Sequence, residues 1–232
     1  MTFVLRSLVA ALAVAICTTG TVFAEGKALE PFNGKDLSGW KTKEPASRSK
    51  WKVGTSKLVA NHPDKIDFSA SGSELVNTEG HGVDIYSEAK FGDHRIEVEV
   101  MVPKGSNSGI YVHGEYEIQV LDSYGKEKIG GGDMGAIYQA SLPKVNASKA
   151  PGEWQKYVIE FRAPKFDDAG KKTANAKFLK VELNGKLIHE NVEMKGPTPT
   201  GVSGKEAAEG PIMFQGDHGA VAYRNLKITP LE

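Results

Sequence analysis

Apolar and polar residues alternate along most of the chain, a pattern that predicts short, half-buried β-strands. The segment HRIEVEVMV (94–102) is a clear case, and residues 154–163 and 178–190 repeat it. The last of these contains Asn184-Gly185, a dipeptide that favours the type I′ turn of a β-hairpin. Long apolar patterns at helical spacing do not recur. The sequence therefore predicts an all-β fold, either a sandwich or a barrel.

Residues 108–122 (SGIYVHGEYEIQVLD) have the alternation of a hairpin, but its two predicted faces differ in character. One face carries ordinary core residues, Ile110, Val112, Ile118 and Val120. The other carries a phenol, an imidazole, a carboxylate and a carboxamide, from Tyr111, His113, Glu117 and Gln119. Solvated sheet faces usually carry Lys, Glu and Thr, so a ligand-binding groove is favoured over a plain wet face. Such a groove suits a saccharide, which needs paired donors and acceptors beside flat apolar surfaces.

The first 24 residues predict a cleaved secretory signal peptide. They contain Arg6, the apolar run LVAALAVAIC and the small-residue cleavage pattern Val22-Phe23-Ala24. The apolar run is roughly a dozen residues, shorter than the ~20 of a membrane-spanning helix. We therefore expect a periplasmic or secreted protein with one domain (25–232) and no membrane span after cleavage.

Cysteine usage and charge exclude several classes of protein. Cys17, the only cysteine, lies inside the predicted signal, so the mature chain has no disulfide and no thiol nucleophile. The chain has 29 basic and 29 acidic residues, and this balance gives no support to a nucleic-acid partner. No G-x-S-x-G motif, P-loop or dinucleotide fingerprint is present, which leaves serine hydrolases, P-loop NTPases and Rossmann enzymes unsupported.

A metal site is the weaker alternative for the polar hairpin. His113, Glu115 and Glu117 alternate along it and could hold a divalent ion if all three faced one side of a strand. However, residues 113–116 could themselves form the turn, which would reset the faces. No H-E-x-x-H motif, cysteine cluster or EF-hand spacing supports a metal, so we expect neither metal nor cofactor.

Two segments, the Gly-rich 126–139 and the Pro/Gly/Ser-rich 196–210, are long enough to overhang a site. A second polar group of residues surrounds a Gly-flanked turn in 214–225 and comprises Gln215, Asp217, His218 and Arg224. A histidine beside an aspartate could act as a general base. The turn role is the favoured interpretation.

Five segments, in order along the chain, resemble the motifs of one family. They are PFNGKDLSGW (31–40), NSGIYVHGEYEIQVLDSYG (107–125), GAIYQ (135–139), GEWQKY (152–157) and GDHGAVAYRNLKI (216–228). The chain is similar, across essentially its whole mature length, to the 3-keto-disaccharide hydrolase domain, also described as a 3-keto-glucoside lyase/hydratase domain. The resemblance implies a concanavalin A-like jelly roll, which is a β-sandwich of two antiparallel sheets, with a site on its concave sheet.

The resemblance also implies which residues form that site. Those at matching motif positions are Glu117, Gln119, Asp122, Tyr138, Gln215, His218 and Arg224. The family commonly has an arginine where His113 stands, a departure that alters contacts or charge at that point. We expect catalytic roles for Glu117, His218 and Arg224. Substrate contacts are expected from Tyr111, His113, Gln119, Asp122, Tyr138 and Gln215.

The activity implied is cleavage of 3-keto-glycosides. A ketone at C3 acidifies the C2 proton, so a base can remove it; the enolate then expels the C1 substituent, and water adds afterwards. Glu117 or His218 would be the base. The enolate oxygen would be stabilised by Arg224, Gln215 or His113. A non-catalytic carbohydrate-binding domain is the main alternative, and a surface scaffold is a third.

Overall fold

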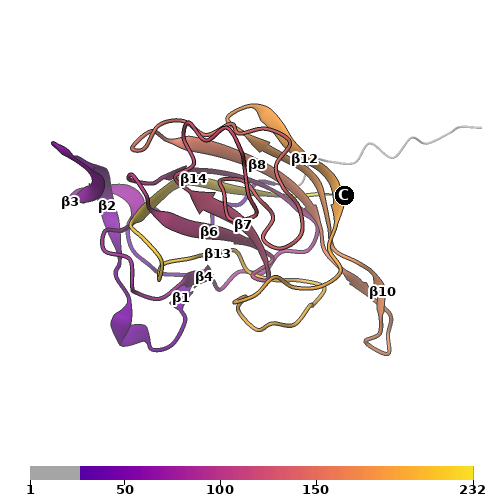
Figure 1. Ribbon diagram of the computed structural model, residues 1–232. Coiled ribbons are helices and arrows are strands. Elements are labelled where there is room, and N and C mark those ends of the chain that lie inside the picture. Colours follow the sequence, from indigo (N-terminus) through magenta and orange to yellow (C-terminus); the bar gives the residue numbers. More distant parts are fainter. Residues whose placement is uncertain (1–26, 232) are drawn as a thin grey trace, which may run out of the picture.

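The computed structural model describes residues 27–231, whose strands form two large antiparallel sheets packed face to face (Figure 1). In spatial order, the seven-stranded sheet comprises β12 (Lys186–Glu193), β11 (Lys177–Leu183), β8 (Gln155–Arg162), β5 (His94–Met101), β14 (Val221–Pro230), β3 (His62–Asn77) and β2 (Trp51–Val59). The five-stranded sheet comprises β1 (Trp40–Thr42), β4 (Ile85–Ser87), β13 (Met213–Phe214), β6 (Asn107–Val112) and β7 (Tyr116–Leu121). The predicted all-β jelly-roll sandwich is confirmed.

The remaining elements among residues 27–231 are small. A separate ribbon pairs β9 (Lys165–Phe166) with β10 (Lys172–Ala174), and one 3₁₀ helix, η1, spans Ala46–Arg48. Within this part of the chain no helix has the length and apolar character needed to cross a membrane. The predicted signal peptide, residues 1–24, lies outside the described residues.

The alternating sequence of β5 produces alternating burial. Ile96, Val98 and Val100 are at most 1% exposed, because they point into the space between the sheets. The intervening Glu97 and Glu99 are half-buried on the opposite face. This is the period-2 pattern by which a strand with one core face is recognised.

The hairpin predicted from Asn184-Gly185 is also confirmed. These two residues join β11 to β12 with φ values of 52° and 76°, the positive range that a type I′ turn requires at both positions. Leu183 pairs directly with Lys186 across the turn.

An aromatic stack joins the two sheets through the core. Phe214 of β13 stacks on Tyr223 of β14, with ring centroids 3.9 Å apart and an interplanar angle of 13°. On its other side Phe214 stacks on Trp40 of β1 at 5.6 Å and 17°. All three side chains are buried. Because Tyr223 belongs to the seven-stranded sheet and its two partners to the five-stranded one, the stack fixes one sheet against the other.

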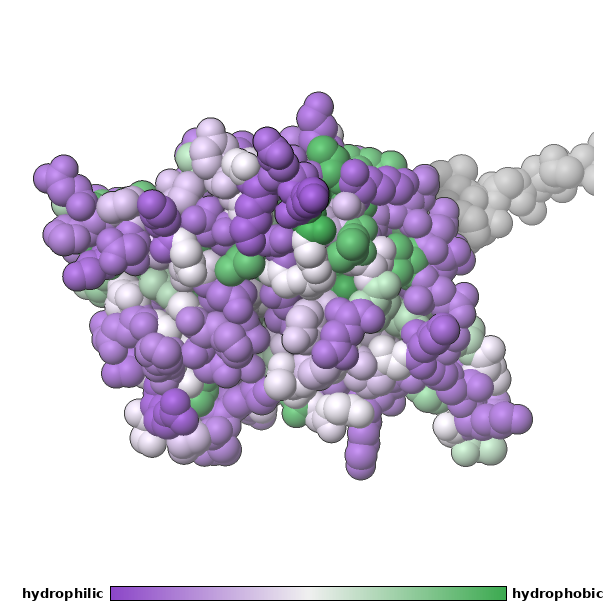
Figure 2. Space-filling model, in the orientation of Figure 1, coloured by the Kyte–Doolittle hydropathy of each residue, from purple (hydrophilic) through white to green (hydrophobic). Residues whose placement is uncertain are grey.

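The two long segments that the sequence predicts to overhang a site both contact the five-stranded sheet, the first along the edge of β7 and the second, 196–210, on its outer face. Tyr138, from the first segment, donates its backbone N–H to the carbonyl of Glu117 at 3.0 Å. Thr200, from the second, bonds the hydroxyl of Tyr111 at 2.7 Å. The surface of the molecule on the side shown is mostly polar (Figure 2).

Phe214→Ala is expected to lower the free energy of unfolding by about 3–5 kcal/mol, because it removes the central ring of the stack and leaves a cavity. Chemical denaturation followed by circular dichroism measures this loss. Tyr124→Ala is the control, since Tyr124 is 59% exposed and its removal should change stability by less than about 0.5 kcal/mol. Equal effects of the two substitutions would show that the stack does not hold the sheets together.

Candidate functional site

The β6–β7 hairpin divides into an apolar and a polar face as the sequence predicts. Tyr111 pairs with Glu117 across the hairpin, and Gly109 pairs with Gln119, so these positions share the outer face. The intervening apolar residues point inward and are fully buried in the core: Ile110, Val112, Ile118 and Val120. Glu117 and Gln119 are nevertheless only 2% and 6% exposed, so this polar face is buried as well.

Neighbouring strands extend the polar face on both sides of the hairpin. Phe214 pairs with Ile85 of β4 and with Ile110 of β6, and Gln215 follows it with its N–H on the carbonyl of Gly109 at 3.0 Å. Asp84 precedes Ile85 on the same alternation. We call the outward group Asp84, Tyr111, Glu117, Gln119, Tyr138 and Gln215 the polar face.

Tyr138 joins the polar face from beyond the edge of the sheet. Ile137 forms a bridge with Ile118, which places Tyr138 next to Glu117. The pairing satisfies backbone groups on the free edge of β7, since the N–H of Tyr138 meets the Glu117 carbonyl. The side chain of Tyr138 is half-buried and lines a hollow whose other wall includes Pro197 and Pro199.

Gly109 makes room for the Glu117 carboxylate. A Cβ atom at position 109 would lie 2.4 Å from Oε1 of Glu117, so the carboxylate lies directly above the glycine. Glycine within a strand commonly marks such a close approach. Any side chain at this position would displace the carboxylate.

Burial raises the pKa of Glu117 to about 7. Hydrogen bonding from Tyr111 and the positive charge of His218 act in the opposite direction, whereas the negative charge of Asp84 raises the pKa further. A carboxyl group with this pKa exchanges protons readily at neutral pH, as a general base must. Burial likewise raises the pKa of Tyr111, so its hydroxyl stays protonated and can donate a hydrogen bond.

Gln215 has an unusual hydrogen-bonding state. The residue is 6% exposed, and its Oε1 has no hydrogen-bond donor among residues 27–231. Buried polar atoms normally have a partner, and an unsatisfied one costs about 1–3 kcal/mol. The backbone of Gln215 is well held, because its carbonyl accepts the hydroxyl of Ser108 at 2.7 Å.

Asp217 and His218 form a pair at the rim of the site. Nδ1 of His218 bonds the carboxylate of Asp217, and both side chains are about half exposed, at 50% and 47%. The backbone of this turn is fixed by the N–H of His81, which donates to the Asp217 carbonyl at 3.0 Å. The histidine therefore has a carboxylate orienting its ring, and it remains accessible to solvent.

The structure does not bring Arg224 to the polar face, which corrects the expected catalytic contact. Arg224 lies on β14 of the other sheet, immediately after the inward-pointing Tyr223, so its side chain points away from the core. Nε donates to Glu99 at 2.6 Å, and the guanidinium lies 3.9 Å from the ring centre of Trp154. These contacts hold Arg224 on the outer face of the seven-stranded sheet.

His113 is also separated from the polar face, because it lies in the hairpin turn with φ of 59°. Its ring is 1% exposed and packs against Phe161 of the core, with centroids 5.6 Å apart. Nε2 bonds the carbonyl of Ala207 at 2.8 Å. The residue expected to contact substrate therefore anchors the covering segment 196–210.

Glu115 has a similar anchoring role. Its oxygens accept the N–H groups of Ser203 at 2.8 Å and Gly204 at 2.9 Å. The turn separates Glu115 from Glu117, and in the part of the chain that the structure describes no three His, Cys, Asp or Glu residues form a metal-binding group. The three alternating residues that could have shared an ion thus have separate partners.

Asp122 holds two loops where β7 ends. Its carboxylate accepts the N–H of Gly105 at 3.0 Å and that of Tyr124 at 3.3 Å. The expected substrate contact of Asp122 is therefore replaced, in this structure, by bonds to backbone.

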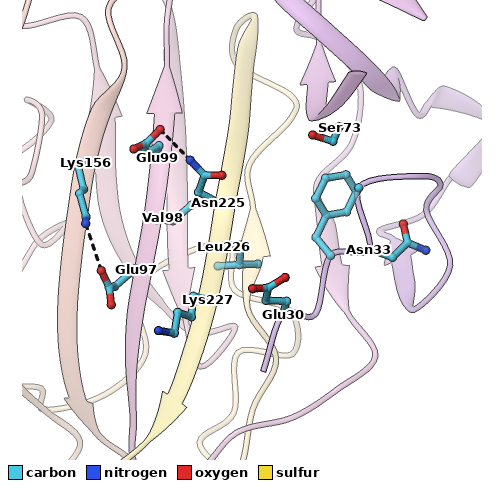
Figure 3. Close-up of a pocket in the computed structure, with 12 residues that line it drawn as sticks. Glu30, Asn33, Ser73, Glu97, Val98, Glu99, Lys156, Asn225, Leu226 and Lys227 are labelled. Carbon is cyan, nitrogen blue, oxygen red and sulfur yellow. Dashed lines mark hydrogen bonds and ion pairs between the residues drawn. The ribbon is translucent and has the colours of Figure 1, made fainter. Parts of the chain in front are cut away.

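A second hollow lies over the outer face of the seven-stranded sheet, beside the N-terminal segment that carries Glu30 and Asn33 (Figure 3). Its charged groups are largely paired with one another. Lys156 contacts Glu97 at 3.2 Å, and Asn225 donates to Glu99 at 3.1 Å. It is separated from Glu117 by the whole thickness of the sandwich.

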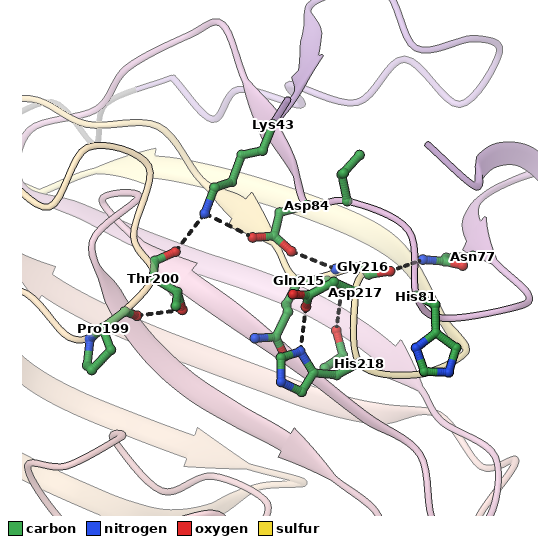
Figure 4. Close-up of polar contacts among 12 residues, drawn as sticks. Lys43, Asn77, His81, Asp84, Pro199, Thr200, Gln215, Gly216, Asp217 and His218 are labelled. Carbon is green, nitrogen blue, oxygen red and sulfur yellow. Dashed lines mark hydrogen bonds and ion pairs between the residues drawn. The ribbon is translucent and has the colours of Figure 1, made fainter. Parts of the chain in front are cut away.

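Two residues of the site have no local signal in the sequence. Lys43 contacts Asp84 at 3.3 Å, and Asp84 accepts the N–H of Gly216 at 3.0 Å beside Gln215 (Figure 4). Lys43 follows a three-residue strand and Asp84 precedes another, and strands this short cannot be recognised from the sequence alone. Only the pairing of distant strands reveals the contact.

Solved structures with the same fold come from Parabacteroides distasonis ATCC 8503. One, described as a "putative glycosyl hydrolase", is 29% identical, with a TM-score of 0.67 over 88% of this chain and 84% of that chain. Another with the same description is 18% identical, with a TM-score of 0.59 over 89% and 94%, and shows similarity of fold alone. A search of curated proteins finds no match.

The family resemblance of the five sequence motifs is confirmed by a family model that matches residues 27–229. The match includes every residue of the polar face. The chain belongs to the family of the 3-keto-alpha-glucoside-1,2-lyase-like domain.

Proposed function

We propose that this protein is an exported enzyme that cleaves 3-keto-glycosides on the polar face of the five-stranded sheet. Its family and the 29% identical relative described as a "putative glycosyl hydrolase" support a carbohydrate-active function in general. The signal-like sequence of residues 1–24 is the basis for proposing export to the periplasm or the exterior. The observation that carries the specific reaction is the buried Glu117 carboxylate, with its pKa of about 7.

The buried position of Glu117 lowers the stability of the native state, which favours a functional role for the residue over a structural one. A rise in pKa from the ordinary 4.5 to about 7 corresponds to about 3 kcal/mol of lost native-state stability when the group is ionised. A glutamine of the same shape would avoid that cost. Strongly perturbed carboxyl groups in covered sites are typical of acid–base catalysts.

In the proposed reaction Glu117 removes the C2 proton of the sugar, which the C3 ketone has made acidic. The electron pair passes to the ketone oxygen as an enolate, then returns to expel the C1 oxygen, which takes up a proton. Water finally adds across the resulting double bond, so the overall change is hydrolysis. His218, oriented by Asp217 at the rim, is assigned the proton transfer to the leaving oxygen.

The enolate needs a hydrogen-bond donor on the polar face, since Arg224 and His113 lie elsewhere. The side-chain amide groups of Gln119 and Gln215 are the neutral donors that remain, because the single proton of the Tyr111 hydroxyl is already hydrogen-bonded. Oε1 of Gln215, which lacks a donor, is suited to accept a sugar hydroxyl. Tyr138 offers an aromatic face for the C–H side of the ring.

Glu117→Gln is expected to lower kcat on 3-keto-trehalose and 3-keto-lactose by about 10²–10⁴-fold, because it removes the base but keeps the shape of the side chain. Sugar release is followed by chromatography, with the unoxidised disaccharides in parallel. Arg224→Met is the control and should retain the wild-type rate.

Three results would argue against this mechanism. Full turnover by Glu117→Gln would show that Glu117 is not the general base. Equal cleavage of the unoxidised sugars would indicate an ordinary glycosidase. Saccharide binding without any turnover by the wild-type protein would favour the carbohydrate-binding alternative.

The pH–rate profile should follow the ionisation of Glu117. A general base acts in its deprotonated form, so kcat/KM is expected to fall as the pH drops below about 7. Initial rates between pH 5 and 9 test this. A profile that is flat through neutrality, or that keeps the same acid limb in Glu117→Gln, would contradict the assignment.

The ionisation of Glu117 should also affect stability, which is expected to fall as the pH rises, whereas kcat/KM rises. The native-state pKa of Glu117 is above its unfolded value, so its stabilising contribution is complete below about pH 4.5 and is lost as the pH rises through about 7. Glu117→Gln is therefore expected to raise the Tm relative to wild type at pH 8, and much less at pH 5. Thermal melts at both pH values provide the measurement, and an equal difference at both would exclude the titration as its cause.

A further inference from the structure

Lys43 and Asp84 connect the two loops that flank the polar face (Figure 4). Nζ of Lys43 donates to the carbonyl of Thr200 at 2.9 Å, in the covering segment 196–210. The same nitrogen contacts Oδ2 of Asp84 at 3.3 Å. The other oxygen of Asp84 accepts the N–H of Gly216 at 3.0 Å. One continuous series of polar contacts thus runs from one loop to the other.

Each loop carries groups of the proposed site. Thr200 bonds the hydroxyl of Tyr111 at 2.7 Å and so fixes the donor beside Glu117. Gly216 lies between Gln215 and the Asp217–His218 pair. The side-chain amide of Asn77 donates to the carbonyl of Gly216 at 2.8 Å, and the N–H of Gly216 donates to Asp84. A shift of either loop would change the position of these groups relative to the carboxylate of Glu117.

The pair of Lys43 and Asp84 is more protected from solvent than the nearby pair of Lys41 and Glu88. The side chains of Lys43 and Asp84 are 30% and 7% exposed. Lys41 and Glu88, which pair at 3.1 Å across the adjacent position, are 59% and 51% exposed. Exposed pairs contribute little, whereas loss of one partner from a buried pair leaves a charge without compensation. The two pairs therefore provide a matched comparison.

We propose that Lys43 and Asp84 form a positioning pair that sets the separation of the two loops, and thereby places Gln215 and His218 opposite Glu117. The proposal rests on the function assigned above and extends it to residues that do not touch the substrate. Misplacement of reacting groups by about 1 Å can cost about a hundredfold in rate, so such a pair should affect kcat more than KM.

Asp84 has a second effect on the same site through its charge. Of the ionisable groups around Glu117, Asp84 raises its pKa, whereas His218 and the hydrogen bond from Tyr111 lower it. Lys43 and the N–H of Gly216 help to keep Asp84 ionised, in opposition to its burial, which raises the pKa of Asp84 itself. Removal of the charge at position 84 should therefore make Glu117 more acidic.

The test compares Lys43→Met, Lys43→Arg and Asp84→Asn with the control Lys41→Met, all in the mature chain. Lys43→Met is expected to lower kcat on 3-keto-trehalose by about ten- to a hundredfold with a small change in KM. Lys43→Arg should retain most of the wild-type rate, because arginine keeps the positive charge and the hydrogen-bond donors. Asp84→Asn should shift the acid limb of the pH–rate profile to lower pH. Lys41→Met should match wild type.

A readout that does not depend on turnover separates this proposal from the proposed reaction. In protein with ¹³C-labelled glutamate side chains, the carboxyl signal of Glu117 is identified by its absence in Glu117→Gln and then titrated. Asp84→Asn should lower its midpoint, and Lys43→Met should move the side-chain amide signals of Gln215; Lys41→Met should do neither. These shifts would support the pair even if the wild-type protein cleaves no keto sugar. Wild-type midpoints, amide signals and kcat in folded Lys43→Met and Asp84→Asn would overturn it.

Discussion

The burial of one carboxylate above a strand position without a side chain is the constraint on which the rest of the site depends. Glu117 lies over Gly109, and neither solvent nor a neighbouring cation compensates its charge fully. The segment containing Thr200 lies against this outer face, and the segment containing Tyr138 extends the face at the edge of β7, so the carboxylate is buried on a face that would otherwise be wet. The fold thus has two buried faces on one sheet, an apolar one that stabilises the sandwich and a polar one that costs stability.

Polar residues of a single hairpin have two separate tasks. Glu117 and Gln119 remain on the strand and face the covered site, whereas His113 and Glu115 in the turn bind the backbone of segment 196–210. The second task makes the first possible, because it holds the cover in place. Buried side chains that accept or donate several hydrogen bonds to one loop make that loop a wall of the site.

The sequence predicts the strands, the Asn184-Gly185 hairpin and the two faces of residues 108–122, because period-2 alternation depends only on neighbouring residues. It does not predict which sheet a strand joins, and Arg224 was expected at the site although β14 pairs on the other side of the core. A turn also resets the alternation, as at His113. Lys43 and Asp84 meet only through the pairing of β1 with β4, a long-range contact that no local pattern encodes.

The polar face and the residues around it draw on distant parts of the described chain, from Lys43 and Asp84 to Gln215 and His218. Contacts between such distant segments carry a loop-closure cost that slows folding, and the site depends on all of them being formed. A saccharide that binds there would stabilise the native state against global unfolding, by an amount set by its concentration relative to its Kd. Occupancy of the site and integrity of the fold are therefore thermodynamically linked, and protection from heat or proteolysis would report the bound sugar directly.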